Sequence, residues 1–450
     1  MKLNIFYLLI PAVVFTFNSC EPTVDDFTPS KGNADFSKYV ALGNSLTAGY
    51  ADGALYLSGQ ENSYPAIIAG QLKSSGFMTT DFKQPLMKDE YGFGGKRIMG
   101  LSQDCTGAHS LAPVVDPTAP NPLNFASVAA EGPFQNMGVP GAKVGHLLAP
   151  GFGNPANGPG LYNPYFTRFA ADIATSSILG DAVAQTPTFF SLWIGNNDVL
   201  GYATAGGGNG GNAITPSASF SSYYGMIVGG LVATGAKGVL INIPAVTSTP
   251  FFTTVPNNGI QLKPTPEDTI KRNMLNAAYG NGALGISFSI GNNYWVIQDT
   301  ARPAPYQFRQ IKSNEFLLLT LPQDSLKCAG WGTQKPIPHQ YVLDTVEVAS
   351  IMAATAAYNT AIAQLAEANG LALADVNTFM NQIKQNGLMV NGKRFSSTFV
   401  TGGIFSLDGI HLSKQGNAIV ANYIIDAINA KYGSTIPKVD PNNYPGIVFP

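Results

Sequence analysis

The chain has 450 residues, a formal net charge of −2, and only 12% charged residues against 45% hydrophobic ones. Its 25 Lys and Arg residues balance 27 Asp and Glu residues without forming a basic stripe, which argues against nucleic-acid binding; the apolar content excludes a disordered chain. With 49 Gly and 31 Pro, the sequence predicts long ordered loops, and its length fits one α/β domain with large insertions as well as three smaller domains.

Residues 1–19 have the features of a secretory signal peptide. Lys2 supplies a positive charge, and Ile5 to Phe17 form an apolar stretch that is too short to span a bilayer. Ser19-Cys20 resembles the cleavage site of bacterial lipoproteins, in which the Cys is lipidated and becomes the new N-terminus. The resemblance implies an exported lipoprotein anchored in the outer membrane, on its periplasmic or cell-surface face. Ordinary signal cleavage nearby is the alternative.

Residues 20–35 are short of bulky hydrophobic side chains and are predicted to form a tether between the lipidated Cys20 and a folded body that starts at Phe36. Two further cysteines, Cys105 and Cys328, remain in the mature chain. An oxidising compartment permits them to pair. The spacing alone does not show whether their Cα atoms come close enough, so a disulfide and two buried free thiols both remain open.

Short apolar runs that end at Gly, Pro or polar residues predict buried parallel strands. These runs are Lys38 to Gly43, Thr188 to Ile194, Gly238 to Ile243 and Leu371 to Val376. Helical patterns lie between and after them, at Tyr64 to Leu72, Phe220 to Val232, Val346 to Glu367 and Ser413 to Ile428. Strands that alternate with helices predict βαβ units and a parallel sheet covered on both faces.

Two long segments do not fit this alternation. Residues 91–132 and 250–340 are rich in Gly, Pro, Asn and Thr and are predicted to be insertions. The second contains strand-like stretches at Asn293 to Gln298 and Phe316 to Leu321, which predict a small β subdomain.

Four polar motifs lie after predicted strands, after a short apolar stretch, or just before the last predicted helix. They are Gly43-Asn44-Ser45-Leu46-Thr47, Asn136-Met137-Gly138-Val139-Pro140-Gly141, Gly195-Asn196-Asn197-Asp198 and Asp408-Gly409-Ile410-His411. Open α/β sheets build their sites where strands end, so we expect these motifs to lie close together. In this order they resemble four of the conserved blocks of the SGNH (GDSL-like) hydrolase family. The resemblance implies a three-layer α/β/α, flavodoxin-like fold, with residues 36–450 forming a single hydrolase domain that carries both insertions.

The residues themselves support a nucleophilic mechanism. A serine hydroxyl is a weak nucleophile until a base takes its proton, and His411 is one of only four histidines. Asp408, three residues before it, can fix the imidazole tautomer that turns the other ring nitrogen toward Ser45. The sequence therefore predicts a Ser45, His411 and Asp408 triad.

The resemblance also implies an oxyanion hole. Its donors are expected to be the backbone N–H groups of Ser45 and Gly141 and the side-chain amide of Asn197. Gly141 lacks a Cβ, so a substrate carbonyl can approach its backbone closely. Asn197 offers an uncharged donor that does not compete with the triad for protons.

Asn44 stands where the family usually has Asp. Asn keeps a short side chain that can hydrogen-bond the turn but loses the negative charge; we expect activity to survive, because Asp408 supplies the acid of the triad. The neighbour of Asn197, Asp198, is expected to be structural. The other histidines, His109, His146 and His339, show no ligand-like spacing with Cys, Asp or Glu, so no metal site and no cofactor are predicted.

The leading interpretation is a serine esterase or lipase-like acyl hydrolase that works through an acyl-enzyme on a small ester or an acyl lipid at a membrane. One alternative is an esterase for O-acetyl groups on carbohydrates. Another is a non-catalytic surface lipoprotein that binds glycans through its insertions. The last interpretation does not explain why all four motifs occur together.

Overall fold

The computed structural model describes residues 27–120, 125–210 and 212–450. The predicted signal peptide and Cys20 lie outside these residues. None of the described helices combines the length and the apolar character needed to cross a membrane.

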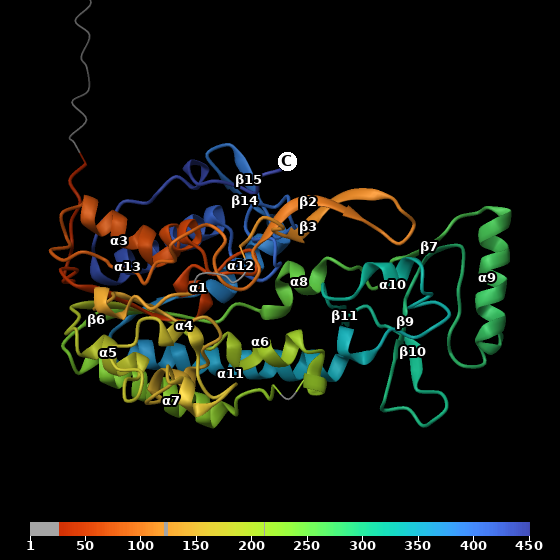
Figure 1. The fold of residues 1–450 in the computed structure, drawn as a ribbon, viewed down its shortest axis with the longest axis horizontal. Coiled ribbons are helices and arrows are strands. Elements are labelled where there is room, and N and C mark those ends of the chain that lie inside the picture. The colour runs from red at the N-terminus through yellow and green to blue at the C-terminus, as the bar shows by residue number, and fades with distance from the viewer. Residues whose placement is uncertain (1–26, 121–124, 211) are drawn as a thin grey trace, which may run out of the picture.

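A five-stranded parallel sheet forms the centre of the molecule (Figure 1). Its strands, from edge to edge, are β13 (Ala372–Ala374), β6 (Lys237–Ile241), β5 (Phe189–Trp193), β1 (Tyr39–Gly43) and β4 (Asn136–Gly138). Ranked by chain position these strands have the flavodoxin-like order 2-1-3-4-5, in which the topological switch point lies between the first and third strands, here β1 and β5. The predicted fold class and its four apolar strands are confirmed.

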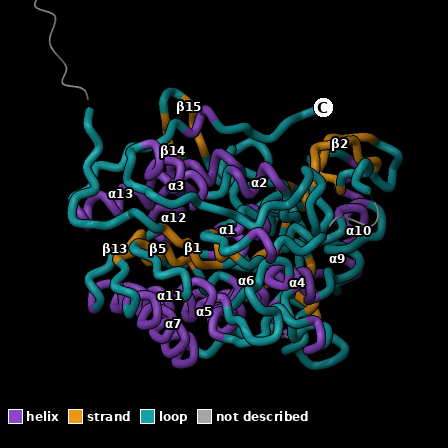
Figure 2. The backbone as a smooth tube through the Cα atoms, turned by 60° about the vertical axis from the view of Figure 1, so that its left-hand side comes forward, coloured by secondary structure: helices purple, strands orange, loops and turns teal. Residues whose placement is uncertain are grey.

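Helices cover both faces of the sheet, which gives three layers (Figures 1 and 2). One layer contains α3 (Tyr64–Ser74), α12 (Val376–Asn386) and α13 (Lys414–Tyr432). The other contains α5 (Ile178–Val183), α6 (Asn197–Thr204), α7 (Ser217–Val232) and α11 (Thr345–Ala368). Successive residues of β1 pack alternately into the two layers: Tyr39 and Ala41 into the first, Val40 and Leu42 into the second. Both sides of the sheet are therefore buried, as the continuous apolar runs require.

Local sequence signals set the ends of the long helices. Ser413 caps α13 by accepting a hydrogen bond from the N–H of Gly416. Asp344 and Glu347 form a capping box at the start of α11. The remaining helices and strands outside the insertions are short: α1 (Ser45–Ala48), α2 (Leu57–Glu61), α4 (Pro164–Thr167), β14 (Leu388–Val390) and β15 (Lys393–Phe395).

The folded body begins before Phe36. Ser30 exchanges hydrogen bonds with Thr435, the N–H of Asn33 donates to the carbonyl of Tyr432, and Ala34 is buried. The predicted tether boundary at residue 35 is therefore too late, because backbone pairing with the end of α13 holds this polar segment without large side chains of its own.

The first predicted insertion contains an antiparallel hairpin of β2 (Arg97–Gln103) and β3 (His109–Val115). The second extends from one end of the molecule (Figure 1). Its elements are α8 (Pro250–Thr253), β7 (Ile260–Leu262), α9 (Pro266–Ala278), β8 (Gly291–Asn293), β9 (Val296–Gln298), β10 (Phe308–Gln310), β11 (Phe316–Leu317) and α10 (Gln323–Lys327). It has two small apolar clusters of its own and returns to the core through the pairing of β11 with β12 (Val342–Leu343).

A disulfide between Cys105 and Cys328 joins the two insertions across 223 residues of sequence. The backbone N–H of Cys105 also donates to Asp324, and Lys327 pairs with Asp104. Of the two alternatives for these cysteines, the structure contains the disulfide and not the free thiols, because the tip of the β2–β3 hairpin lies against α10.

Candidate active site

Ser45 lies where β1 ends and α1 begins. The side chain of Asn44 caps this short helix by accepting a hydrogen bond from the N–H of Leu46 at 3.0 Å. Gly43, at the end of β1, is tightly packed: a Cβ at this position would lie 2.4 Å from the carbonyl oxygen of Trp193. The strand end, the small residue and the cap together hold Ser45 at the carboxyl edge of the sheet.

His411 connects Ser45 with Asp408. Its Nε2 lies 2.8 Å from the Ser45 Oγ, and its Nδ1 lies 2.8 Å from the Asp408 Oδ2. The structure thus brings together the three residues of the predicted triad, from positions 366 residues apart. In this arrangement the Nδ1–H donates to the carboxylate, which leaves Nε2 able to accept the serine proton.

Asp408 is held by a dense set of donors. Its Oδ1 accepts hydrogen bonds from the Ser406 hydroxyl and the backbone N–H groups of Ile410 and His411, and its Oδ2 accepts from the N–H of Gly53. Burial acts to raise the pKa of this carboxyl, but the charge and hydrogen bonds of His411 outweigh burial and hold the pKa well below 3.8. Asp408 therefore stays ionised across the pH range in which imidazole chemistry operates.

Two residues outside the four motifs support this loop. Asp52 accepts from the N–H of Leu407 at 2.9 Å, and its own N–H donates to the Ser406 hydroxyl at 3.0 Å. The Tyr50 ring lies 4.8 Å from the His411 ring, centre to centre. The four motifs do not include Asp52 or Tyr50; the Asp52-Gly53 dipeptide is the one local turn signal that points to this segment, and Asp52 has φ 54°.

Two of the predicted oxyanion donors, the Ser45 N–H and the Asn197 amide, belong to residues that line one cavity; the third, Gly141, directly precedes Ala142, whose carbonyl accepts from Asn197. Among the described residues, no acceptor pairs with the backbone N–H of Ser45 or of Gly141, which has φ +80°. Asn197 uses one N–H of its amide on the carbonyl of Ala142 at 2.9 Å, and its other N–H has no acceptor in the described part of the chain. Asn197 lines a cavity together with Ser45 and His411. Unpaired N–H donors beside a nucleophile can stabilise a negatively charged oxygen.

Comparison with known proteins agrees with this geometry. The sequence profile described as GDSL-like Lipase/Acylhydrolase matches residues 39–424. The chain belongs to this family. It is therefore a hydrolase that acts on ester bonds.

A search of solved structures matched an alpha/beta hydrolase from the metagenome of Lake Arreo, with 12% identity over 88% of this chain and 97% of that chain and a TM-score of 0.37. An acetyl xylan esterase from Geobacillus stearothermophilus has 13% identity over 91% and 100% of the two chains and a TM-score of 0.35. A search of curated proteins found no match. At this low structural similarity, the family profile alone assigns the chain.

In this GDSL-like hydrolase, Asn44 stands where the family usually has Asp, and its contacts show what the amide does. Asn44 is buried, and its Nδ2 donates to the Oδ1 of Asn196 at 3.3 Å while its Oδ1 caps α1. An Asp at this position would keep the cap but would present a second acceptor to Asn196. The amide therefore links the loop after β1 with the loop after β5.

Asp198 has a structural role, as expected. It is buried in the first turn of α6 and accepts hydrogen bonds from the N–H of Val144 at 3.0 Å and from the Thr215 hydroxyl at 2.7 Å. Burial raises its pKa from 3.8 to about 6, and these two hydrogen bonds offset the effect only in part. Asp198 thereby ties together the segments that flank Asn197.

This raised pKa predicts a pH-dependent stability. The folded state binds a proton at Asp198 up to about pH 6, whereas the unfolded state releases it near pH 3.8, so the free energy of unfolding should fall as the pH rises between these values. The change attributable to Asp198 should be about 1–3 kcal/mol. Denaturant unfolding of the wild type and of Asp198→Asn at pH 4 and pH 7 measures it as the difference between the two proteins. Asp426→Asn, at an exposed ion pair with Lys438, is the control and should leave the pH dependence unchanged.

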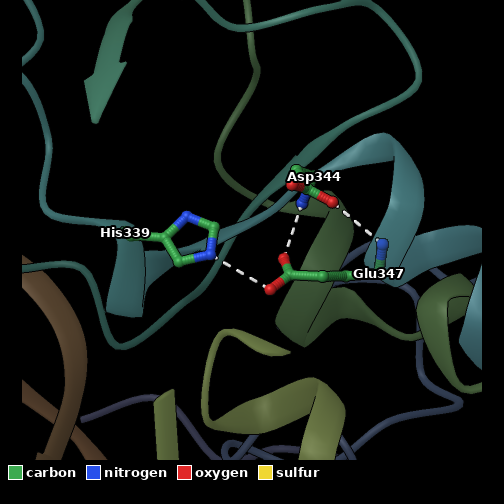
Figure 3. Close-up of side chains that lie close together, drawn as sticks. All are labelled: His339, Asp344 and Glu347. Atoms are coloured by element: carbon green, nitrogen blue, oxygen red, sulfur yellow. Dashed lines mark hydrogen bonds and ion pairs between the residues drawn. The ribbon is translucent and has the colours of Figure 1, made fainter. Parts of the chain in front are cut away.

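His339 has carboxylate neighbours that its sequence spacing did not reveal. One potential ligand atom from each of His339, Asp344 and Glu347 lies within 4.8 Å of the others, and the His339 Nε2 lies 3.0 Å from the Glu347 Oε1 (Figure 3). The prediction that His339 has no ligand-like neighbours is wrong, because the turn before α11 places His339 beside the carboxylates of the first helical turn. The contact with Glu347 makes His339 a hydrogen-bonded histidine. Asp344 and Glu347 already serve the capping box of α11.

No carboxylate in the part of the chain that the structure describes hydrogen-bonds to the ring of His109 or His146, the other two histidines outside the triad. His109 is exposed on β3, and the His146 Nδ1 accepts from the N–H of Lys143 at 3.2 Å. Among the described residues, only the His339 cluster gathers three potential metal ligands, and it does not include Ser45 or His411.

Proposed function

We propose that this protein is a serine esterase in which Ser45 attacks the ester carbonyl, His411 takes and returns the proton, and Asp408 orients and stabilises the imidazolium. The Ser45 N–H, the Gly141 N–H and the Asn197 amide bind the oxyanion. The reaction proceeds through an acyl-serine: the alcohol leaves with a proton from His411, and water, activated by the same base, releases the acid.

The observation that carries this proposal is the pair of 2.8 Å contacts made by His411, one to Ser45 and one to Asp408. A non-catalytic glycan-binding protein does not need a serine hydroxyl that is hydrogen-bonded to an imidazole, nor a buried carboxylate that orients this imidazole. Family membership favours the same conclusion.

A fluorophosphonate probe tests the nucleophile directly. The wild type should be labelled covalently, and Ser45→Ala should show no labelling, because phosphonylation requires an activated hydroxyl. Ser58→Ala is the control, since it removes another serine hydroxyl, one that donates to Glu90 at 2.6 Å, and should be labelled like the wild type. Absence of labelling in folded wild type, or labelling of Ser45→Ala, would overturn the proposal.

We further propose that Cys20 carries a lipid that holds the enzyme at the outer membrane of a bacterial cell. Support comes from the charged, apolar and small-residue pattern of residues 1–20. In cells that express the full chain, the probe-labelled protein should fractionate with membranes and should become soluble in the Cys20→Ala variant. Membrane association that survives this substitution would refute the anchor.

A further inference from the structure

We propose that the disulfide between Cys105 and Cys328 is a redox-sensitive device that positions residues 406–411, the turn that carries the acid and the base of the triad and is here called the catalytic turn. While the disulfide is intact, the two insertions hold this turn in place, and reduction by a dithiol lowers kcat. The inference rests on the proposed function, because it concerns the rate of ester hydrolysis at Ser45. It adds a means of regulation to that function.

The first insertion supports the catalytic turn through the Asp52-Gly53 dipeptide. The N–H of Arg97, the first residue of β2, donates to the carbonyl of Asp52 at 2.7 Å. The Asp52 carboxylate accepts from the N–H of Leu407, and the N–H of Gly53 donates to Asp408 at 3.0 Å. Two hydrogen bonds and one peptide bond therefore connect β2 with the acid of the triad.

The second insertion contacts the same turn at Gly409. The N–H of Phe251 in α8 donates to the carbonyl of Gly409 at 2.9 Å, and the N–H of Leu319 donates to the carbonyl of Phe251 at 2.8 Å. Packing here is tight, since a Cβ at Gly409 would lie 3.0 Å from the Leu319 side chain and 3.1 Å from the Phe251 nitrogen. Gly409 lies between Asp408 and His411 in the chain, so both insertions contact the segment that carries the acid and the base.

The parts of the insertions that the disulfide joins have little packing of their own. Across the described ranges, β2 and β3 pair only with each other. Leu101 and Leu111 face each other across the hairpin and are 71% and 47% exposed. Helix α10 has five residues, none of which is buried. Because a two-stranded hairpin by itself is only marginally stable in water, the position of this hairpin depends on its attachment to α10.

Two weaker contacts accompany the disulfide where the hairpin meets α10 (Figure 1). The N–H of Cys105 donates to the Asp324 side chain at 3.1 Å, and Lys327 forms an ion pair with Asp104. The Lys327 side chain is 52% exposed, and exposed ion pairs contribute little to stability. Once the covalent bond is broken, these contacts do not hold the hairpin against α10.

The disulfide is placed where a dithiol can reduce it, because Cys105 and Cys328 are both exposed. One thiolate of the dithiol attacks one sulfur and displaces the other cysteine as a thiolate, and the second thiol of the reagent then releases the first cysteine. The protein gains two thiols and the dithiol becomes a disulfide, with two electrons and two protons transferred. Exposed disulfides are the class that exchanges most readily.

The test compares kcat and KM for p-nitrophenyl butyrate before and after reduction with dithiothreitol. It uses the Cys20→Ala variant, in which Cys105 and Cys328 are the only cysteines. Reduction should lower kcat about tenfold and leave KM within twofold, because a displaced acid and base slow the reaction rather than the binding of the ester. The rate of fluorophosphonate labelling at Ser45 should fall by the same factor, and reoxidation should restore both rates.

Two sets of variants separate positioning from general loss of structure. The double variant Cys105→Ser, Cys328→Ser should have the kcat of the reduced enzyme and should not respond to the dithiol. Leu275→Ala is the matched control, because Leu275 on α9 is 4% exposed in an apolar cluster of the second insertion that includes neither Phe251 nor Leu319. It should lower the temperature of thermal unfolding and keep kcat. If the double variant does not fold, reduction of the folded enzyme still decides.

The two proposals fail in different ways. An enzyme that is labelled at Ser45 and keeps its kcat when titration finds both thiols free would overturn the positioning role and leave the esterase intact. A fall in kcat that only accompanies loss of cooperative unfolding would also overturn it, because the disulfide would then stabilise the fold alone. A protein that takes no probe and cleaves no ester in the oxidised form would overturn the proposed function itself.

Discussion

Replacing His411 by Ala should lower kcat for p-nitrophenyl butyrate by about 10⁴- to 10⁶-fold, as loss of the base does in other serine hydrolases. The His411 Nε2, 2.8 Å from the Ser45 Oγ, is the acceptor for the serine proton in the described structure. Without it the hydroxyl must attack as a weak neutral nucleophile. The residual rate should be that supplied by the oxyanion donors and by binding.

His146→Ala is the control for the loss of a half-buried imidazole. The His146 ring packs 4.4 Å from the Phe152 ring, centre to centre, and its Nδ1 accepts from Lys143, so this substitution removes comparable packing away from Ser45. It should retain activity within a few-fold. A decrease of less than tenfold in His411→Ala would remove His411 from the role of base.

Replacing Asp408 by Asn should lower kcat by about 10³- to 10⁴-fold with a small change in KM. The Asp408 Oδ1 already accepts three hydrogen bonds, so the amide oxygen of Asn takes that position. Its Nδ2 then faces the His411 Nδ1 and the Gly53 N–H, where Oδ2 had accepted. The imidazole adopts the other tautomer, with a proton on Nε2, and can no longer accept the proton of Ser45.

The pH dependence distinguishes orientation from simple loss of structure. If the variant is limited by the tautomer, kcat should recover partly at high pH, where a larger fraction of Ser45 ionises, while thermal unfolding stays cooperative. Asp344→Asn, at a carboxylate that caps α11 by two backbone N–H groups, should leave kcat unchanged. Near-normal activity of Asp408→Asn would show that another group orients His411.

The strands and long helices could be predicted from the sequence because their signals are local. The apolar run at Tyr39–Gly43 and the Ser413 cap act within one strand or one helical turn. The strand predicted from Phe316 to Leu321 was too long, because only Phe316 and Leu317 find a partner in β12. Helix α12 was not predicted, although Asp375 caps it by accepting from the N–H of Thr378.

The residues of the candidate site also divide into those with a local sequence signal and those placed only by contacts between distant segments. Asp408 and His411 are three residues apart in one turn, and resemblance to a family linked them to Ser45, Gly141 and Asn197. The support from Asp52 to Leu407, 355 residues away, had no sequence signal that pointed to its partner. The cavity that Ser45, His411 and Asn197 line likewise had none, because its wall comes from separate parts of the chain that converge only at the end of the sheet.

The sequence by itself determined a Gly- and Pro-rich parallel α/β chain of low charge, its main strands and helices, and the residues able to carry ester hydrolysis. These depend on side-chain periodicity, caps and motifs, which act over a few residues. Only the tertiary structure decided that Cys105 pairs with Cys328, that the folded body includes Ser30 to Ala34, and that a mainly apolar cavity opens at Ser45. These features depend on which distant surfaces pack together, and their free energy comes from contacts that no local pattern specifies.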